Sequence, residues 1–139
     1  MSYFDDELEK DLSNSNITFE KLKPEVHDSF VSSINKKFPF SGSKITWNTL
    51  PNSMNYVKKE ANQAFIDISK RITTLNASEI IFIGDSLTDK AYKISTANLE
   101  CALAIFADIP QHTYFFSESL SFIGCISSEG EIDFSESSS

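Results

Sequence analysis

The spacing of apolar residues predicts helices in the first half of the chain. Apolar side chains recur every three or four positions over residues 19–36 and 53–74, which is the period of an amphipathic helix. Pro24 is compatible with the first of these helices if it falls in the first turn, where no backbone N–H is needed. Residues 3–12 show a shorter, acidic pattern that is typical of a helix or an arm, and residues 44–50 alternate as a strand or an extended loop does.

In the second half of the chain the pattern changes to that of strands. Short runs that are continuously apolar, or rich in aromatic and β-branched residues, predict strands over residues 79–84, 112–117, 121–127 and 131–135. Residues 128–130 are a credible hairpin turn between the last two strands. A further helix is expected from Thr96 or Asn98 until Pro110, whereas the pattern of residues 88–95 is ambiguous.

Together these elements predict one domain over residues 1–139. A chain of 139 residues is long enough for one substantial core and short for two. The fold class we expect is α/β of the α+β type, in which N-terminal helices pack on a mixed sheet that ends in a C-terminal antiparallel meander.

Composition indicates a soluble, cytoplasmic protein. No apolar run approaches the roughly 20 residues that a membrane span requires. The acidic N-terminal residues lack the apolar stretch of a secretory signal. Cys101 and Cys125 do not have the spacing of a metal or redox site, so we expect both thiols to be reduced and buried.

Negative charge is concentrated in the second half of the chain. Residues 71–139 carry ten acidic and three basic side chains, which gives −7 of the total formal charge of −8. Such a field repels nucleic acid and speeds association with a basic partner, although acidic residues also serve solubility alone. We therefore expect a basic protein partner and neither nucleic acid nor a membrane.

The letters GDSL at residues 84–87 raise the question of catalysis because they follow an apolar strand. They resemble the first motif of the GDSL hydrolases, in which the serine is the nucleophile. That resemblance implies later blocks with a Gly-x-Asn-Asp motif and an Asp-x-x-His pair. The chain has no such Asn block, and Asp108 and His112 are one position too far apart. Without a base and oxyanion donors Ser86 is not activated, so we do not expect it to be a nucleophile.

The same stretch also resembles the late acidic motif of haloacid-dehalogenase-type phosphatases, in which Asp85 and Asp89 would help to hold Mg²⁺. That chemistry requires an Asp-x-Asp nucleophile near the N-terminus. The nearest pair, Asp5 and Asp6, is adjacent, so its side chains point in different directions. The simpler interpretation is a turn whose polar side chains bond nearby backbone groups, and we predict no catalytic residue.

We expect no metal or other cofactor. His27 lies on the polar side of a predicted helix and has no second ligand at metal spacing, so we expect an exposed residue there. His112 begins an aromatic strand, where it serves the structure or contacts a partner. The chain contains no glycine-rich phosphate-binding loop of the known kinds.

The C-terminal hairpin is the best candidate for a binding surface. Strand alternation directs Ile132 and Phe134 to the core, and Glu131 and Asp133 to the opposite face. Carboxylates on rigid strands are good hydrogen-bond acceptors for the guanidinium group of arginine. The simpler alternative is that this face of the strand is only solvated. We predict a partner-binding surface that comprises Asp85, Asp89, Tyr114, Glu118, Glu129, Glu131 and Asp133.

A family resemblance lies in the same region. The segment IPQHTYFFSESLSFIGCISSEGEIDF, residues 109–134, is similar to bacterial immunity proteins of contact-dependent growth inhibition and related polymorphic toxin systems. The resemblance implies a cytosolic, non-enzymatic inhibitor that binds one cognate toxin domain, often a nuclease. A nuclease presents a basic cleft to phosphates, which acidic groups can occupy. The open alternatives are a generic protein-interaction or adaptor domain, an enzyme with an unfamiliar site, or a GDSL-type hydrolase that uses Ser86.

Overall fold

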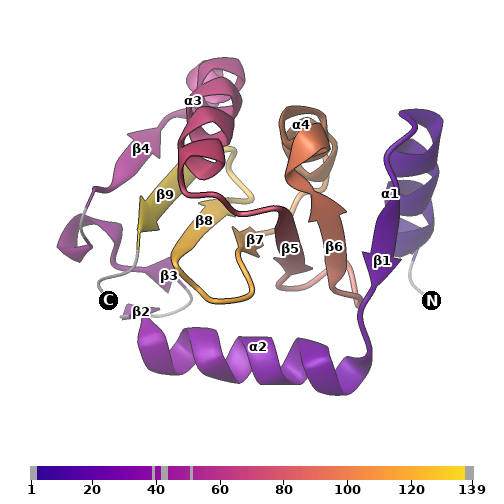
Figure 1. Ribbon diagram of the computed structural model, residues 1–139, viewed down its shortest axis with the longest axis horizontal. Coiled ribbons are helices and arrows are strands. Elements are labelled where there is room, and N and C mark those ends of the chain that lie inside the picture. Colours follow the sequence, from indigo (N-terminus) through magenta and orange to yellow (C-terminus); the bar gives the residue numbers. More distant parts are fainter. Residues whose placement is uncertain (1–2, 39, 42–43, 51, 137–139) are drawn as a thin grey trace.

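An antiparallel sheet forms the centre of the molecule. The computed structural model describes residues 3–38, 40–41, 44–50 and 52–136. In this part of the chain a seven-stranded sheet has the order β1-β6-β5-β7-β8-β9-β4 (Figure 1). The strands are β1 (Phe19–Lys21), β4 (Met54–Tyr56), β5 (Glu79–Gly84), β6 (Tyr92–Ser95), β7 (Thr113–Phe116), β8 (Phe122–Ile126) and β9 (Ile132–Glu136). A separate small hairpin pairs β2 (Phe40–Ser41) with β3 (Lys44–Ile45).

Helices cover the two faces of the sheet unequally. On one face lie α1 (Tyr3–Asn14), α3 (Ala61–Thr74) and α4 (Leu99–Ala107), whereas α2 (Pro24–Lys37) crosses the other face (Figure 1). Short 3₁₀ turns, η1 (Trp47–Thr49), η2 (Lys58–Glu60) and η3 (Thr96–Asn98), lie in the connections. The domain is therefore a layered α+β sandwich, with the sheet between unlike helical layers.

The larger core lies between the sheet and the helices α1, α3 and α4. Alternate side chains of β5 to β9 meet Leu8 and Leu12 of α1, and Ile68 and Ile72 of α3. Phe82 of β5 stacks on Phe106 of α4 with ring centroids 4.2 Å apart. All these side chains are buried, and this face of the sheet supplies most of the hydrophobic stabilisation.

A smaller core lies between the sheet and α2. It contains Ile81 and Ile83 of β5, Phe116 of β7 and Ile123 of β8. Of the fourteen residues of α2, all of which the structure describes, Ile34 is the buried one. Phe30 is half-buried and its ring lies 5.2 Å from that of Phe116. The second helical layer is thus lightly packed.

The structure confirms the predicted fold class and the strands of the second half, and it corrects two helix starts. Residues 19–21 form β1, which pairs with β6, and Pro24 then opens α2 in its first turn as predicted. Residues 54–56 form β4, which pairs with β9. The helical spacing of apolar residues continues through both strands, so the pattern shows no sign of a change of element. The hydrogen-bond partners that make these residues strands are remote in sequence, and local spacing does not report them.

Two further expectations change. The sheet was expected to be mixed, but every pairing among the described strands is antiparallel. The crossover through α4 joins β6 to β7, which run in the same direction but are separated by β5, so no parallel neighbours arise. The thiols were expected to be buried, yet Cys101 is exposed on α4 while Cys125 is buried in β8.

Candidate functional site

The loop after β5, which carries the GDSL letters, wraps around the buried side chain of Gln111. Three consecutive backbone N–H groups converge on its Oε1, at 3.2 Å from Ser86, 2.7 Å from Leu87 and 3.2 Å from Thr88. The Gln111 amide nitrogen donates in turn to the Thr88 hydroxyl at 2.9 Å. A side chain at Gly84 would collide with both groups, so this position requires glycine for close packing.

Asp85 and Ser86 make local contacts within the same loop. Asp85 Oδ1 accepts from the backbone N–H of His112 at 3.0 Å and from the Ser86 hydroxyl at 3.2 Å. The Asp85 N–H donates to the His112 carbonyl at 3.0 Å, which extends the β5–β7 pairing by one residue. His112 Nδ1 accepts from the Ser128 N–H at 2.9 Å. The Ser86 hydroxyl thus points to a carboxylate, and the ring of His112 holds the β8–β9 turn.

Strand register brings several predicted site residues to one end of the α2 face. Ile83 pairs with Tyr114, Tyr114 with Cys125, and Cys125 with Asp133, so this row of side chains shares the α2 face. Two positions toward the sheet end, Asp85 and Glu131 fall on the same face by alternation. Glu129 occupies the β8–β9 turn at this end. The end of β5 and the β8–β9 turn therefore lie at the same end of the sheet, with β7 and β8 between Asp85 and Glu131.

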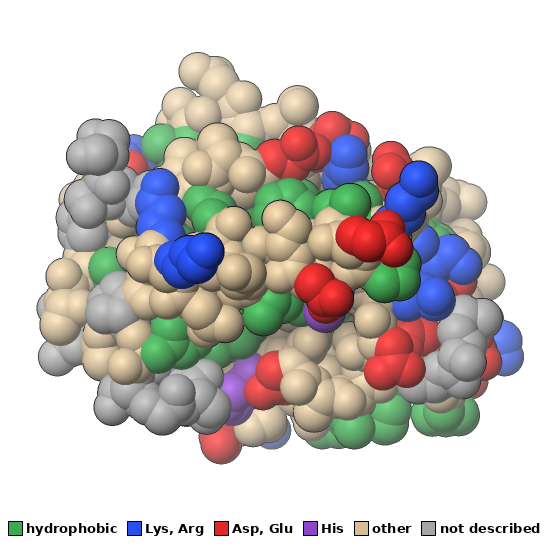
Figure 2. Space-filling view, turned by 90° about the horizontal axis from the view of Figure 1, so that it is seen from below, with side chains coloured by type: hydrophobic (Ala, Val, Ile, Leu, Met, Phe, Trp, Pro, Cys, Tyr) green, Lys and Arg blue, Asp and Glu red, His purple; other side chains and the backbone are tan. Residues whose placement is uncertain are grey.

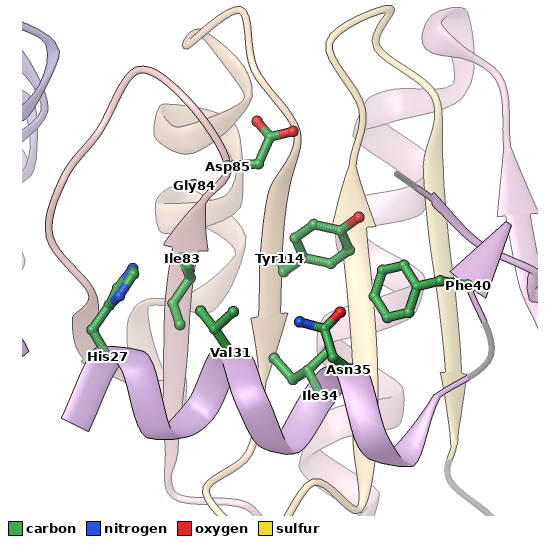
Figure 3. Close-up of a pocket in the computed structure, with 9 residues that line it drawn as sticks. All are labelled: His27, Val31, Ile34, Asn35, Phe40, Ile83, Gly84, Asp85 and Tyr114. Atoms are coloured by element: carbon green, nitrogen blue, oxygen red, sulfur yellow. The ribbon is translucent and has the colours of Figure 1, made fainter. Parts of the chain in front are cut away.

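A groove lies between α2 and the sheet, and Asp85 is among the residues that line it. Its volume is about 520 Å³, within the range of ligand pockets. Figure 3 shows how α2 contributes to one wall and β5 and β7 to the other, with Asp85 beyond the strand end. The lining residues are His27, Val31, Ile34, Asn35, Phe40, Ile83, Gly84, Asp85 and Tyr114.

The groove is apolar with polar groups at its edges. Viewed from the α2 side, hydrophobic surface shows along both flanks of the helix, near acidic side chains and histidine (Figure 2). The ring of Tyr114 lies 6.5 Å from that of Phe40. Burial, with smaller contributions from Cys125 and Asp85, raises the pKa of Tyr114, so the phenol keeps its proton at neutral pH.

The structure places two predicted site residues elsewhere. Glu118 follows β7 at the opposite end of the sheet, where its carboxylate lies 3.1 Å from the ammonium group of Lys93. Asp89 is held near α1, because its backbone N–H donates to Asp5 Oδ2 at 2.7 Å. Glu118 is separated from the hairpin turn because β7 runs from the turn's end of the sheet to the other. Asp89 lies in the connection between β5 and β6, at the same end of the sheet as the turn, but its backbone is bonded to α1.

Two neighbouring elements contact the acidic hairpin. Asp133 Oδ1 accepts from the Asn55 side-chain amide of β4 at 2.6 Å. Gly130 has φ of 92° in the turn, and the stem of Lys58 lies against it. The turn is thus packed against η2, and Asp133 is bonded to β4.

Sequence reasoning missed the residues that α2 contributes to the groove. His27 was expected to be exposed, but 24% of its side chain is accessible because it faces the groove wall. His27, Val31 and Asn35 are spaced by four and share one stripe of the helix. That spacing was a usable signal, although the mixed chemistry of the stripe concealed it. Gln111 gave no signal at all, because its role depends on a loop 23 to 25 residues away.

The described part of the chain contains neither a cluster of metal ligands nor a helix that could span a membrane. Within residues 3–38, 40–41, 44–50 and 52–136, no group of three His, Cys, Asp or Glu side chains could hold a metal ion. In the same ranges, every helix is too short or too polar to cross a membrane. No model of a known protein family matches the sequence, and neither does any curated protein sequence.

Proposed function

We propose that this protein is an immunity-type inhibitor, which binds and neutralises a basic toxin domain, most simply a nuclease. The observation that carries the proposal is that Asp85, which lines an apolar groove, lies at the same end of the sheet as the β8–β9 turn with its acidic residues Glu129 and Glu131. An apolar centre beside charged groups is the usual composition of a protein-binding surface.

Electrostatics supports a basic partner. A nuclease must present cations to the phosphates of its substrate, and a carboxylate surface can occupy the same cleft. The formal charge of −8 steers such a partner during encounter. Asp133 lies on β9, and Glu129 and Glu131 lie in the short connection between β8 and β9. The two paired strands hold this backbone, so these carboxylates lose little entropy on binding.

The proposal is tested with the toxin domain that it requires in the neighbouring reading frame. The change is the simultaneous replacement Glu129→Lys, Glu131→Lys and Asp133→Lys. We expect the affinity for the toxin domain to fall by about 100-fold or more, because close carboxylate–arginine pairs become repulsive. Calorimetry measures the affinity, and cell survival during toxin expression measures protection.

A matched variant carries the same change of charge on the opposite side of the molecule. Asp11, Glu100 and Asp108 are exposed on α1 and at α4, so their replacement by Lys keeps the total charge equal to that of the hairpin variant. This control should slow association and leave most of the affinity intact. Equal losses in the two variants, or a neighbouring gene that encodes a metabolic enzyme, would overturn the proposal.

A further inference from the structure

The groove between α2 and the sheet has the chemistry of a site for one particular side chain. Val31, Ile34 and Ile83 form apolar walls, and Phe40 and Tyr114 present aromatic rings. Asp85 also lines the groove, and Figure 3 shows it at one end, beyond the last residue of β5. Among the described residues that line the groove there is no Lys or Arg, so the charge of Asp85 is not offset within the lining.

Asp85 retains the capacity to accept further hydrogen bonds. Its Oδ1 receives the N–H of His112 and the hydroxyl of Ser86. A carboxylate offers about four acceptor positions, so the second oxygen is able to receive donors from a ligand. The local contacts also fix the orientation of the carboxylate, which lowers the entropy cost of binding.

We infer that this groove receives an arginine side chain of the protein partner. The inference rests on the proposed function and adds the chemistry of the anchor. The aliphatic stem of the arginine would lie between Val31 and Ile83, and its guanidinium group would donate to Asp85. The rings of Tyr114 and Phe40 offer it a face for stacking.

Arginine fits these features better than the other long side chains do. The guanidinium group is planar, donates to two acceptors in one plane and stacks on aromatic rings, whereas lysine presents a compact and strongly hydrated ammonium group. An aromatic side chain would fill the apolar part and leave Asp85 desolvated without a partner, which costs free energy. Arginine is also enriched among the residues that dominate binding at protein interfaces.

A titration of the ¹⁵N-labelled protein with short peptides tests the inference directly. The probe is acetyl-Gly-Arg-Gly-amide, and the matched control replaces arginine with citrulline, which has nearly the same shape but no charge. We expect saturable shifts of the amide signals of Val31, Ile83, Asp85 and Tyr114 at millimolar arginine peptide. The citrulline peptide should bind about 10-fold more weakly or worse. Equal shifts with both peptides, or shifts that map away from the groove, contradict the inference.

Variants of the groove provide the second readout. Asp85→Asn keeps an acceptor for the His112 N–H and removes the charge, so the arginine preference should disappear. Asn35→Trp places a bulky ring in the groove from α2 and should abolish binding of both peptides. Ser32→Trp, at an exposed α2 position outside the lining, is the matched control and should bind as the wild type does.

These outcomes separate the inference from the proposed function, because the peptides need no toxin. If the hairpin variant loses the toxin while Asp85→Asn binds the arginine peptide as the wild type does, the arginine site is wrong and the proposed function stands. If the groove selects arginine while the hairpin variant keeps full toxin affinity, the arginine site stands and the acidic inhibitor surface is wrong.

Discussion

The two faces of the sheet differ in how their helices are held. Side-chain hydrogen bonds tie α1 and α3 to the sheet: the Tyr92 hydroxyl of β6 lies 2.7 Å from Asp5 Oδ1 of α1, and the Tyr56 hydroxyl of β4 donates to Asp67 of α3 at 3.0 Å. Arg71 of α3 also bonds Glu136 of β9 through its Nε at 2.7 Å. Among the described residues, no side-chain hydrogen bond links α2 to the sheet. Apolar contact alone holds that helix.

This difference indicates that one face of the sheet stabilises the fold and that the other is available for binding. The face with α1, α3 and α4 carries the larger core and the polar anchors, so it can support the fold without help from the other face. The α2 face keeps a partly open groove, exposed Val31 and the acidic strand end. Surfaces that bind partners are commonly drawn from such lightly packed regions, because filling them in the free protein would remove the site.

The largest effect is expected from a paired test of the two cores. Phe82→Ala removes a fully buried ring that stacks on Phe106, and it should lower the free energy of unfolding by about 3–5 kcal/mol. Phe30→Ala removes a half-buried ring from α2, and it should cost about 1 kcal/mol. Urea denaturation measures both values. An equal or larger loss for Phe30→Ala would show that the α2 face is as important to stability as the other face.

A smaller effect is expected at the loop that carries the GDSL letters. Gln111→Ala leaves the N–H groups of Ser86, Leu87 and Thr88 without their shared acceptor, and it should cost about 2 kcal/mol. Ser86→Ala removes one exposed hydroxyl and should change stability by less than about 0.5 kcal/mol.

The same pair of variants addresses the hydrolase alternative. A nucleophile at Ser86 requires that any esterase activity disappears in Ser86→Ala. Our proposal expects no activity that depends on this hydroxyl. Hydrolysis of a chromogenic ester by the wild type, lost in Ser86→Ala while the variant stays folded, would replace the inhibitor proposal with an enzymatic one.

The sequence predicted the elements well where each one carries its own signal. The apolar strand over residues 79–84 and the C-terminal meander have strong local patterns, and the structure confirms them. Strands β1, β4 and β6 were missed or left ambiguous. Each has three or four residues and depends on remote partners for its backbone hydrogen bonds, which a local period cannot reveal.

The candidate site shows the same limit. Alternation along one hairpin correctly placed Glu131 and Asp133 on one face, because a strand repeats every two residues. Which strand end lies beside which depends on the order of strands in the sheet. The sequence therefore joined Asp85 to the hairpin but also included Glu118, which the structure places at the opposite end of the sheet beside Lys93. It could not show that the backbone of Asp89 is bonded to Asp5 of α1. The four-residue spacing of His27, Val31 and Asn35 marks one stripe of α2, but only the packing of the helix on the sheet shows that this stripe lines a groove.

A further effect is a loss of stability in alkaline solution, and it reports on the anchor of α3. Burial, followed by the hydrogen bond to Asp67, raises the pKa of Tyr56 from 10.0 to about 12. The folded state thus holds this proton more tightly than the unfolded state does. The contribution is fully present below pH 10 and is lost as the pH rises through 12, because the folded phenol then also ionises.

Tyr56→Phe tests this anchor. In neutral solution the variant lacks the hydrogen bond to Asp67 and should be less stable by roughly 1 kcal/mol. The gap between wild type and variant should close between pH 10 and 12, since the wild type alone loses the contribution of this phenol there. Urea denaturation across that range measures the gap. Because Tyr92 and Tyr114 also have raised pKa values and remain in both proteins, their effects cancel in the difference. A gap that stays constant with pH would show that Asp67 does not hold α3 through this phenol, and the contrast between anchored α3 and unanchored α2 would then rest on Arg71 and packing alone.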